Sequence, residues 1–126
     1  MIERFISKQA TKEGGEEYLD ARKIIAGDLN RDGVADLAVL YTIEGQGGTN
    51  NHIQYLAVFV RSKSGLVPIA HTVAGGKSNR DVELQSIKNN VIFFQTLKYG
   101  PRDPSCCPSK KGTTRFVLSK GRLKEI

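Results

Sequence analysis

The sequence lacks any apolar stretch long enough to cross a membrane. Apolar runs such as Leu56 to Val60 have the length of a strand, whereas a spanning helix needs roughly 20 residues. The first ten residues also lack the basic start and apolar stretch of a signal peptide. With 39% hydrophobic and 25% charged residues in a chain of 126, the composition is that of an ordinary globular protein. We therefore expect one soluble domain spanning residues 1–126.

Cysteine and histidine are scarce, and this scarcity excludes several kinds of site. Two cysteines with no second Cys pair or neighbouring His do not make a zinc site. His52 and His71 stand alone, and their spacing to Ser, Cys or Asp asks for no nucleophile–base arrangement. The glycine-rich segment 44–51 lacks the Gly-Lys-Ser/Thr ending of a phosphate-binding loop. No catalytic residue is identified, and we do not expect an enzyme.

The net charge of +6 is unevenly placed. Residues 1–76 carry 8 Lys/Arg and 9 Asp/Glu (−1), whereas residues 77–126 carry 11 and 4 (+7). Such asymmetry is found on polyanion-binding faces and also on solubilising surfaces. The cations are scattered singly and are not interleaved with aromatic residues, so we do not expect a nucleic-acid partner. A polyanion-binding protein that uses the basic C-terminal half is an alternative function.

Residue alternation predicts a mainly β protein after a short N-terminal helix. Ile2, Phe5 and Ile6 have helical spacing, and the polar, glycine-containing segment 11–15 is expected to end the helix. The predicted strands are 18–26, 37–43, 53–60, 65–73, 81–87, 91–99, 113–118 and 122–126. Short turns such as Asn89–Asn90 join them. This order predicts an antiparallel meander forming a sandwich or partial barrel.

The segment Asp28 to Asp36 has the spacing of a calcium-binding loop. Side-chain oxygens stand at its first, third, fifth and ninth positions, glycine stands at the sixth, and a backbone carbonyl is available at the seventh. Calcium prefers six to eight oxygen ligands, and a glycine permits the sharp reversal that points them at one centre. The alternative is a metal-free turn, in which the carboxylates would repel one another. The predicted metal ligands are Asp28, Asn30, Asp32, Val34 and Asp36.

Two motifs together resemble those of known proteins. The loop is similar to the calcium loops of dockerins, EF-hands and the FG-GAP and VCBS repeats, although Val39 replaces the twelfth-position Glu of an EF-hand and a strand follows. With the later segment 103–109 it resembles a family of small bacterial exported or lipid-anchored proteins that pair a GDLNGDG-like loop with a DPxCCPS-like segment. The family has no agreed activity. The resemblance implies a periplasmic or extracellular location.

Cys106 and Cys107 are adjacent and lie between Pro104 and Pro108. They are interpreted as structural cysteines that hold the segment 100–112 in shape, either as a vicinal disulfide or as inert thiols. In an exported protein the disulfide is the default, although neighbouring Cα atoms lie closer together than in most disulfides. A thiol–disulfide enzyme that uses this pair is a further alternative.

The polar side chains of the glycine-rich segment make it a candidate recognition loop. Gln46, Thr49, Asn50 and Asn51 can donate and accept hydrogen bonds, and three glycines are expected to keep the loop mobile. The alternative is a connector without a ligand. The favoured function is therefore a calcium-binding extracytoplasmic structural or binding module, with an unknown protein or glycan as its partner.

Overall fold

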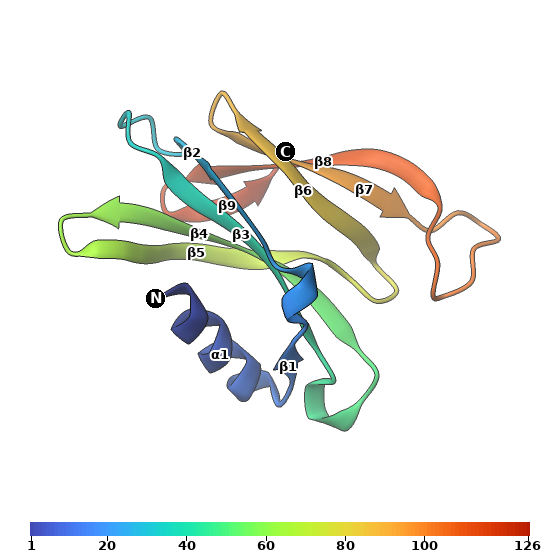
Figure 1. The fold of residues 1–126 in the computed structure, drawn as a ribbon. Coiled ribbons are helices and arrows are strands. Elements are labelled where there is room, and N and C mark those ends of the chain that lie inside the picture. The colour runs from blue at the N-terminus through green and yellow to red at the C-terminus, as the bar shows by residue number, and fades with distance from the viewer.

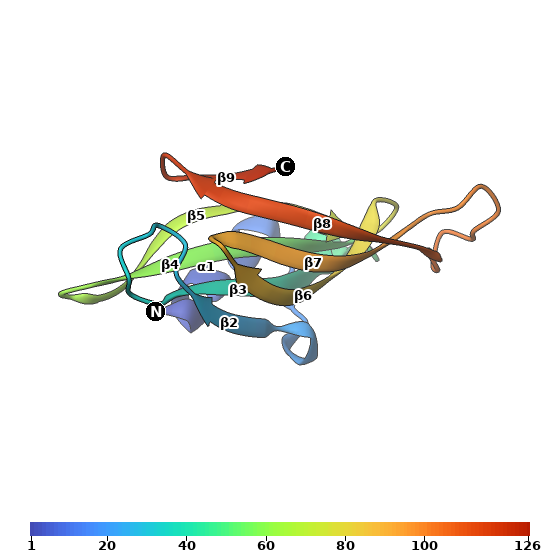
Figure 2. The same cartoon turned by 90° about the horizontal axis from the view of Figure 1, so that it is seen from above.

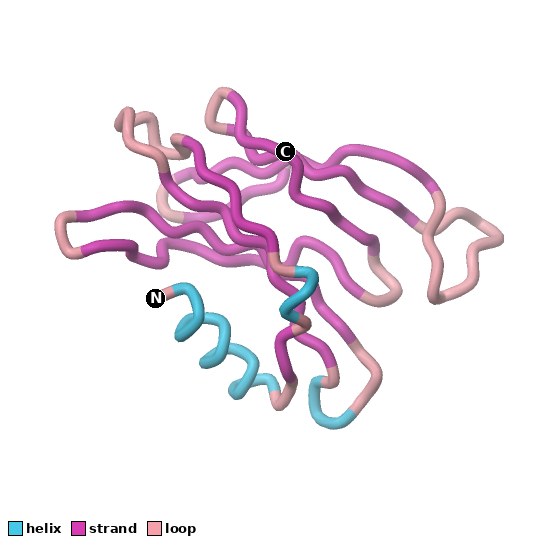
Figure 3. Tube along the Cα trace, viewed as in Figure 1, coloured by secondary structure: helices cyan, strands magenta, loops and turns pink.

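A computed structural model describes all residues from Met1 to Ile126 as one α-helix and nine strands (Figures 1 and 3). The helix α1 spans Ile2–Glu13. The strands are β1 (Glu16–Glu17), β2 (Lys23–Gly27), β3 (Asp36–Glu44), β4 (His52–Ser62), β5 (Gly65–Gly76), β6 (Arg80–Lys88), β7 (Val91–Lys98), β8 (Lys110–Ser119) and β9 (Arg122–Glu125). Two short 3₁₀ helices, η1 (Leu19–Ala21) and η2 (Gln46–Gly48), interrupt them. None of the helices has both the length and the apolar content that a membrane crossing requires.

The strands form one antiparallel meander that is not closed into a barrel. From β3 to β9 every strand pairs with the next one along the chain, and β1 and β2 share the remaining edge of β3. The link from β5 to β6 is a single residue pair, Gly76 with Arg80, so the sheet bends there into two halves. The half made of β1–β5 faces the half made of β6–β9 (Figure 2). The predicted antiparallel sandwich or partial barrel is confirmed.

The bend between the halves has identifiable causes. A Cβ on Gly75 would lie 2.6 Å from the carbonyl oxygen of Arg80, so only glycine permits this close approach. The Arg80 guanidinium donates to the Ala74 carbonyl at 2.8 Å and pairs with Glu125 of β9 at 2.7 Å. Arg80 therefore fastens the bend to the last strand of the second half.

Two clusters of buried side chains lie on the two sides of the first half. The larger one fills the space between the halves and includes Leu40, Leu56, Leu84 and Phe94. The smaller one lies between α1 and the outer face of β3 and β4. Because side chains alternate along a strand, β3 and β4 contribute to both clusters, which explains why they are apolar on both faces.

The helix α1 presents a narrow apolar stripe to the sheet. Ile6 and Ala10 are buried at helical spacing. The helix continues to Glu13, past the predicted break at Thr11, and ends where Gly14 takes a left-handed φ of 67°. Beside this stripe the Tyr55 hydroxyl donates to Glu13 at 2.7 Å. Burial and this hydrogen bond raise the pKa of Tyr55 to about 12.

The segment predicted as a strand from Tyr18 to Ala26 is divided. It begins as η1 and becomes β2 only at Lys23, while β1 at Glu16–Glu17 has no counterpart in the prediction. The Arg22 guanidinium between them bonds the carboxylates of Glu3 and Glu17, which draws this segment toward α1. A tertiary contact thus overrides the local strand pattern. By contrast, the Asn89–Asn90 turn has the predicted positive φ values, 51° and 66°.

Candidate metal centre

The Asp-rich loop is the connection between β2 and β3. The two strands pair antiparallel, and their last register pair is Gly27 with Asp36. Asp28 therefore leaves β2 beside the residue at which the chain re-enters β3. The hairpin closes the loop at its base and returns its first and ninth positions to the same place.

Three carboxylates of this loop converge on one point. Oxygen atoms of Asp28, Asp32 and Asp36 lie within 4.8 Å of one another. Calcium–oxygen distances are 2.3–2.6 Å, so two ligands on opposite sides of one ion are at most about 5 Å apart. The separation in the loop is thus compatible with a shared cation of this size.

Asp36 provides the strongest evidence for a bound cation in this cluster. Its side chain is fully buried, and its Oδ2 accepts a hydrogen bond from the Leu29 backbone N–H at 3.0 Å. Its Oδ1 is buried and has no hydrogen-bond partner. A buried carboxylate oxygen without a partner is costly, and a bound cation is one of the few groups that can offset this cost.

Asp28 organises the turn of the loop. Its carboxylate accepts backbone N–H groups from Asn30 at 3.2 Å, Arg31 at 2.8 Å and Gly33 at 2.9 Å. These hydrogen bonds, with Gly33 the strongest contributor, lower the pKa of Asp28. The carboxylate is therefore charged at neutral pH, as a metal ligand must be.

The loop backbone reverses at two left-handed residues. Gly33 has a φ of 81°, which fulfils the role predicted for the sixth position. Arg31 has a φ of 65° although it carries a side chain, and left-handed conformations are unfavourable for such residues. The Arg31 side chain is exposed, so any energetic cost at this position comes from the backbone conformation.

The remaining predicted ligands lie in the same loop outside the carboxylate cluster. Asn30 is exposed, and its Oδ1 accepts the Asp32 N–H at 3.3 Å. The Val34 side chain is 46% exposed, and its N–H donates to Asp32 Oδ1 at 2.9 Å. Ligation by the Asn30 side chain and the Val34 carbonyl stays a prediction.

Two contacts that the sequence did not reveal attach the loop to the body of the protein. Leu29, 2% exposed, inserts into the cluster between the halves. Asn90, in the turn between β6 and β7, donates its side-chain N–H to the Asp28 carbonyl at 2.8 Å. The metal loop of the first half is therefore fastened to a hairpin of the second half. Asn90 is already explained by its place in a turn, so the sequence gives no sign of its hydrogen bond to Asp28.

The loop that carries the cysteines is organised around another aspartate. Cys106 and Cys107 form a vicinal disulfide and are exposed at the tip of the segment between β7 and β8. Asp103 accepts the Gly100 N–H at 2.6 Å, the Ser109 N–H at 2.9 Å and the Ser109 hydroxyl at 2.9 Å. These bonds lower the pKa of Asp103 and close the loop across its base. The disulfide spans one peptide bond and joins no distant segments.

The predicted recognition loop is attached to the end of α1. Gln46 donates to the Ile43 carbonyl at 2.7 Å, and the Gly47 N–H donates to the Gly14 carbonyl at 3.0 Å. Asn50 accepts a hydrogen bond from Lys77 at 2.7 Å. Thr49, Asn50 and Asn51 border a polar hollow of about 570 Å³, whereas Gln46 lies outside it. The loop therefore has internal hydrogen bonds and a 3₁₀ turn where the sequence predicted mobility alone.

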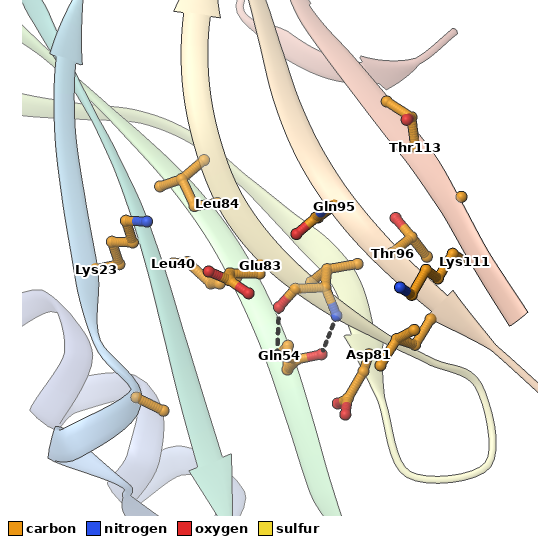
Figure 4. Close-up of a pocket in the computed structure, with 14 residues that line it drawn as sticks. Lys23, Leu40, Gln54, Asp81, Glu83, Leu84, Gln95, Thr96, Lys111 and Thr113 are labelled. Atoms are coloured by element: carbon orange, nitrogen blue, oxygen red, sulfur yellow. Dashed lines mark hydrogen bonds between the residues drawn. The ribbon is translucent and has the colours of Figure 1, made fainter. Parts of the chain in front are cut away.

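A second hollow, of about 750 Å³, lies where the two halves diverge (Figure 4). Leu40 and Gln54 of the first half line it, together with Asp81 to Leu84 of β6. The Gln54 amide bonds both the N–H and the carbonyl of Val82 at 3.0 Å, and so takes the place of a neighbouring strand at this point. None of the metal-loop residues lines this hollow.

Comparison with known proteins yields no relative for this chain. No protein-family model, curated protein or solved structure matches it.

Proposed function

We propose that this protein is a calcium-binding module of the periplasmic or extracellular space, with a structural or binding role and no catalytic one. The observation that carries the proposal is the buried Asp36 carboxylate, which has an unpartnered oxygen and clusters with the carboxylates of Asp28 and Asp32. The location is supported by the resemblance of the Asp28–Asp36 and Asp103–Ser109 segments to exported bacterial proteins.

Calcium suits this donor set better than other common metals. The cluster offers oxygen atoms alone, which are the ligands of hard cations, and offers no imidazole or thiolate for zinc. Three carboxylates, the Asn30 side chain and the Val34 carbonyl would supply five positions, and water would complete the shell. Without a twelfth-position Glu we expect a dissociation constant of about 10⁻⁵ to 10⁻³ M, the weaker part of the range for calcium sites.

The proposed ion would stabilise the junction between the two halves of the sheet. It would offset two of the three negative charges in a loop that Leu29 and Asn90 attach to the interior and to the β6–β7 turn. A metal site of this kind would have a structural role, while other loops of the protein would contact a partner. The hollow beside Thr49, Asn50 and Asn51 is the candidate contact for an unknown protein or glycan.

Calorimetric titration with calcium and with magnesium tests the ion. We expect calcium to bind and magnesium to bind more weakly, because magnesium demands a smaller octahedral shell. Asp36→Asn keeps an oxygen for the Leu29 N–H and removes the charge, so it should abolish binding while the chain still folds. Asp20→Asn, in η1, is the matched control and should bind as the unchanged protein does.

Two results would contradict the proposal. One is the absence of calcium heat at millimolar concentration together with an unchanged melting temperature in EDTA. The other is calcium binding that survives Asp36→Asn, which would place the ion elsewhere. Either result would leave the loop as a metal-free turn.

A further inference from the structure

The outer face of the second half carries apolar side chains that no element of the chain covers. Ile92 and Phe94 of β7 point into the cluster between the halves. Their neighbours Val91 and Phe93 therefore point to the opposite side, because successive side chains of a strand alternate. Both are half-buried, as is Val117, which pairs with Val91 across β7 and β8. Figure 1 shows no helix over this side.

Lysine and arginine side chains lie on either side of these apolar side chains. The register places Lys88, Val91, Val117 and Lys124 in one row across β6, β7, β8 and β9. In the adjoining row Arg115 stands opposite Phe93. We call the set the basic sheet face: Lys88, Val91, Phe93, Arg115, Val117 and Lys124. None of its three cations forms an ion pair.

The outer face of the first half is also apolar, and there a helix covers it. There α1 covers the apolar side chains of β3 and β4, and it is the one α-helix of the chain. Along β7 the same side continues past the exposed Gln95 to the half-buried Leu97, about 20 Å from Val91 at 3.3 Å per residue. A helix of about 13 residues has the same length, and α1 has 12 residues.

We propose that the basic sheet face binds an acidic amphipathic helix of a partner protein. The apolar row matches the apolar stripe of such a helix, and Lys88, Arg115 and Lys124 match acidic residues along its flanks. Asp81 and Glu83 lie on the same side of β6 toward its other end, and Lys111 of β8 lies in the row of Asp81, so the excess of positive charge is confined to the end with Lys88, Arg115 and Lys124. The proposal does not depend on the metal site.

Other occupants match the face less well. A second copy of this chain would bring like charge against like charge, since the net charge is +6. Single-stranded nucleic acid binds through successive aromatic platforms, and Phe93 is the one aromatic residue of this face. Val91 and Val117 offer neither a stacking surface nor a hydrogen bond to a base or a sugar.

The chain itself supplies matched probes for a test. The acidic probe is the peptide Ile2–Glu13 with Arg4, Lys8 and Lys12 changed to Glu, stapled because isolated helices of this length are marginal. The control probe is the same stapled peptide with its natural basic residues. Each is titrated into the isotope-labelled protein, in calcium and in EDTA, and amide signals are followed by NMR.

We expect the acidic probe to shift the signals of Val91, Phe93 and Val117 and the control probe to shift none of them. The triple variant Lys88→Glu, Arg115→Glu, Lys124→Glu should weaken the acidic probe on the order of tenfold or more and should bind the control probe instead. The variant Arg4→Glu, Lys8→Glu, Lys12→Glu has the same charge change on the opposite side of the molecule, and its affinity should stay unchanged.

Three results would overturn the proposal. The first is no shift at the basic sheet face with millimolar acidic probe. The second is equal binding of both probes. The third is a shift confined to Tyr41 and Tyr55, which would mean that the probe displaces α1. Occupation of the face by phosphatidylserine vesicles or single-stranded DNA when the acidic probe fails would assign it to a different partner. The metal proposal is tested by the heat of calcium binding and the helix proposal by NMR shifts. Failure of either proposal therefore leaves the other intact.

Discussion

Two loops of this protein are built around aspartates, and they use the carboxylates differently. In the loop 100–109, Asp103 receives three hydrogen bonds from Gly100 and Ser109 at the loop base. In the loop 28–36, Asp28 is bonded in a similar way, but Asp36 Oδ1 is buried without a partner and a third carboxylate lies beside it. Counting acidic residues would not separate the loops. The two loops differ because the loop 28–36 alone has a buried carboxylate with an unpartnered oxygen and a cluster of three carboxylates.

The largest effect expected from this difference is on calcium-dependent stability. At free calcium 100 times the dissociation constant, binding should add about 2.7 kcal/mol to the free energy of unfolding. Asp32→Ala should abolish this gain because it removes one of the three carboxylates. Urea unfolding with calcium or EDTA measures it, and Asp20→Ala is the control. An equal calcium gain in Asp32→Ala would show that the cluster is not the site.

Asp103→Ala should have the next largest effect, and that effect should be independent of calcium. The variant removes the acceptor for Gly100 and Ser109, so the loop base should open and the amides of these residues should exchange faster with solvent. Hydrogen exchange by NMR measures the change. Calcium affinity should not move. A loss of calcium affinity in this variant would mean that the two loops are coupled and do not act independently.

Arg31→Gly should stabilise the metal loop without calcium. Left-handed backbone costs a residue with a side chain roughly 1–2 kcal/mol, and the added freedom of glycine in the unfolded chain returns about 0.4–1 kcal/mol of that. We expect a net gain of about 0.5–1 kcal/mol in urea unfolding. Gly33→Ala, at the other left-handed position, should lower stability. A loss on Arg31→Gly would show that the arginine side chain has a role of its own.

Replacing Cys106 and Cys107 with Ser should change stability little. A disulfide acts mainly by closing a loop of the unfolded chain, and this one closes the shortest loop possible. We expect a loss under about 1 kcal/mol and a smaller local effect than Asp103→Ala. Thermal unfolding under oxidising and reducing conditions checks this. A larger loss would support the interpretation in which the cysteines hold the loop in shape.

The smallest effect expected is a shift in acid titration. The pKa values of Asp28 and Asp103 are both lowered in the folded state. Their contribution to stability is therefore present above the unfolded pKa of about 3.9 and is lost as pH falls through the lowered folded value. The Gly33 and Gly100 amide signals report the two carboxylates. Calcium should move the Gly33 midpoint to lower pH and leave the Gly100 midpoint in place; equal shifts would contradict the comparison.

Much of the metal loop could be predicted because its geometry is local. Alternate oxygen side chains around a glycine converge wherever a short hairpin closes, and the strand after Asp36 follows from its apolar alternation. The spacing therefore identified Asp28, Asp32 and Asp36 as neighbours. It could not show that Asp36 is buried with an oxygen left unpaired, because burial and the single hydrogen bond from the Leu29 N–H are set only when the chain has folded.

The elements whose position depends on distant residues were the ones the sequence left open. Strand periodicity determined by itself that the chain is an antiparallel meander, since side-chain alternation is a property of each strand. Tertiary structure alone decided where the sheet bends, which face α1 covers and that Arg115 stands opposite Phe93. Those features depend on register and on contacts such as Gln54 with Val82 and Asn90 with Asp28. Their free energy belongs to pairs of residues far apart in the chain, so no single segment carries the signal.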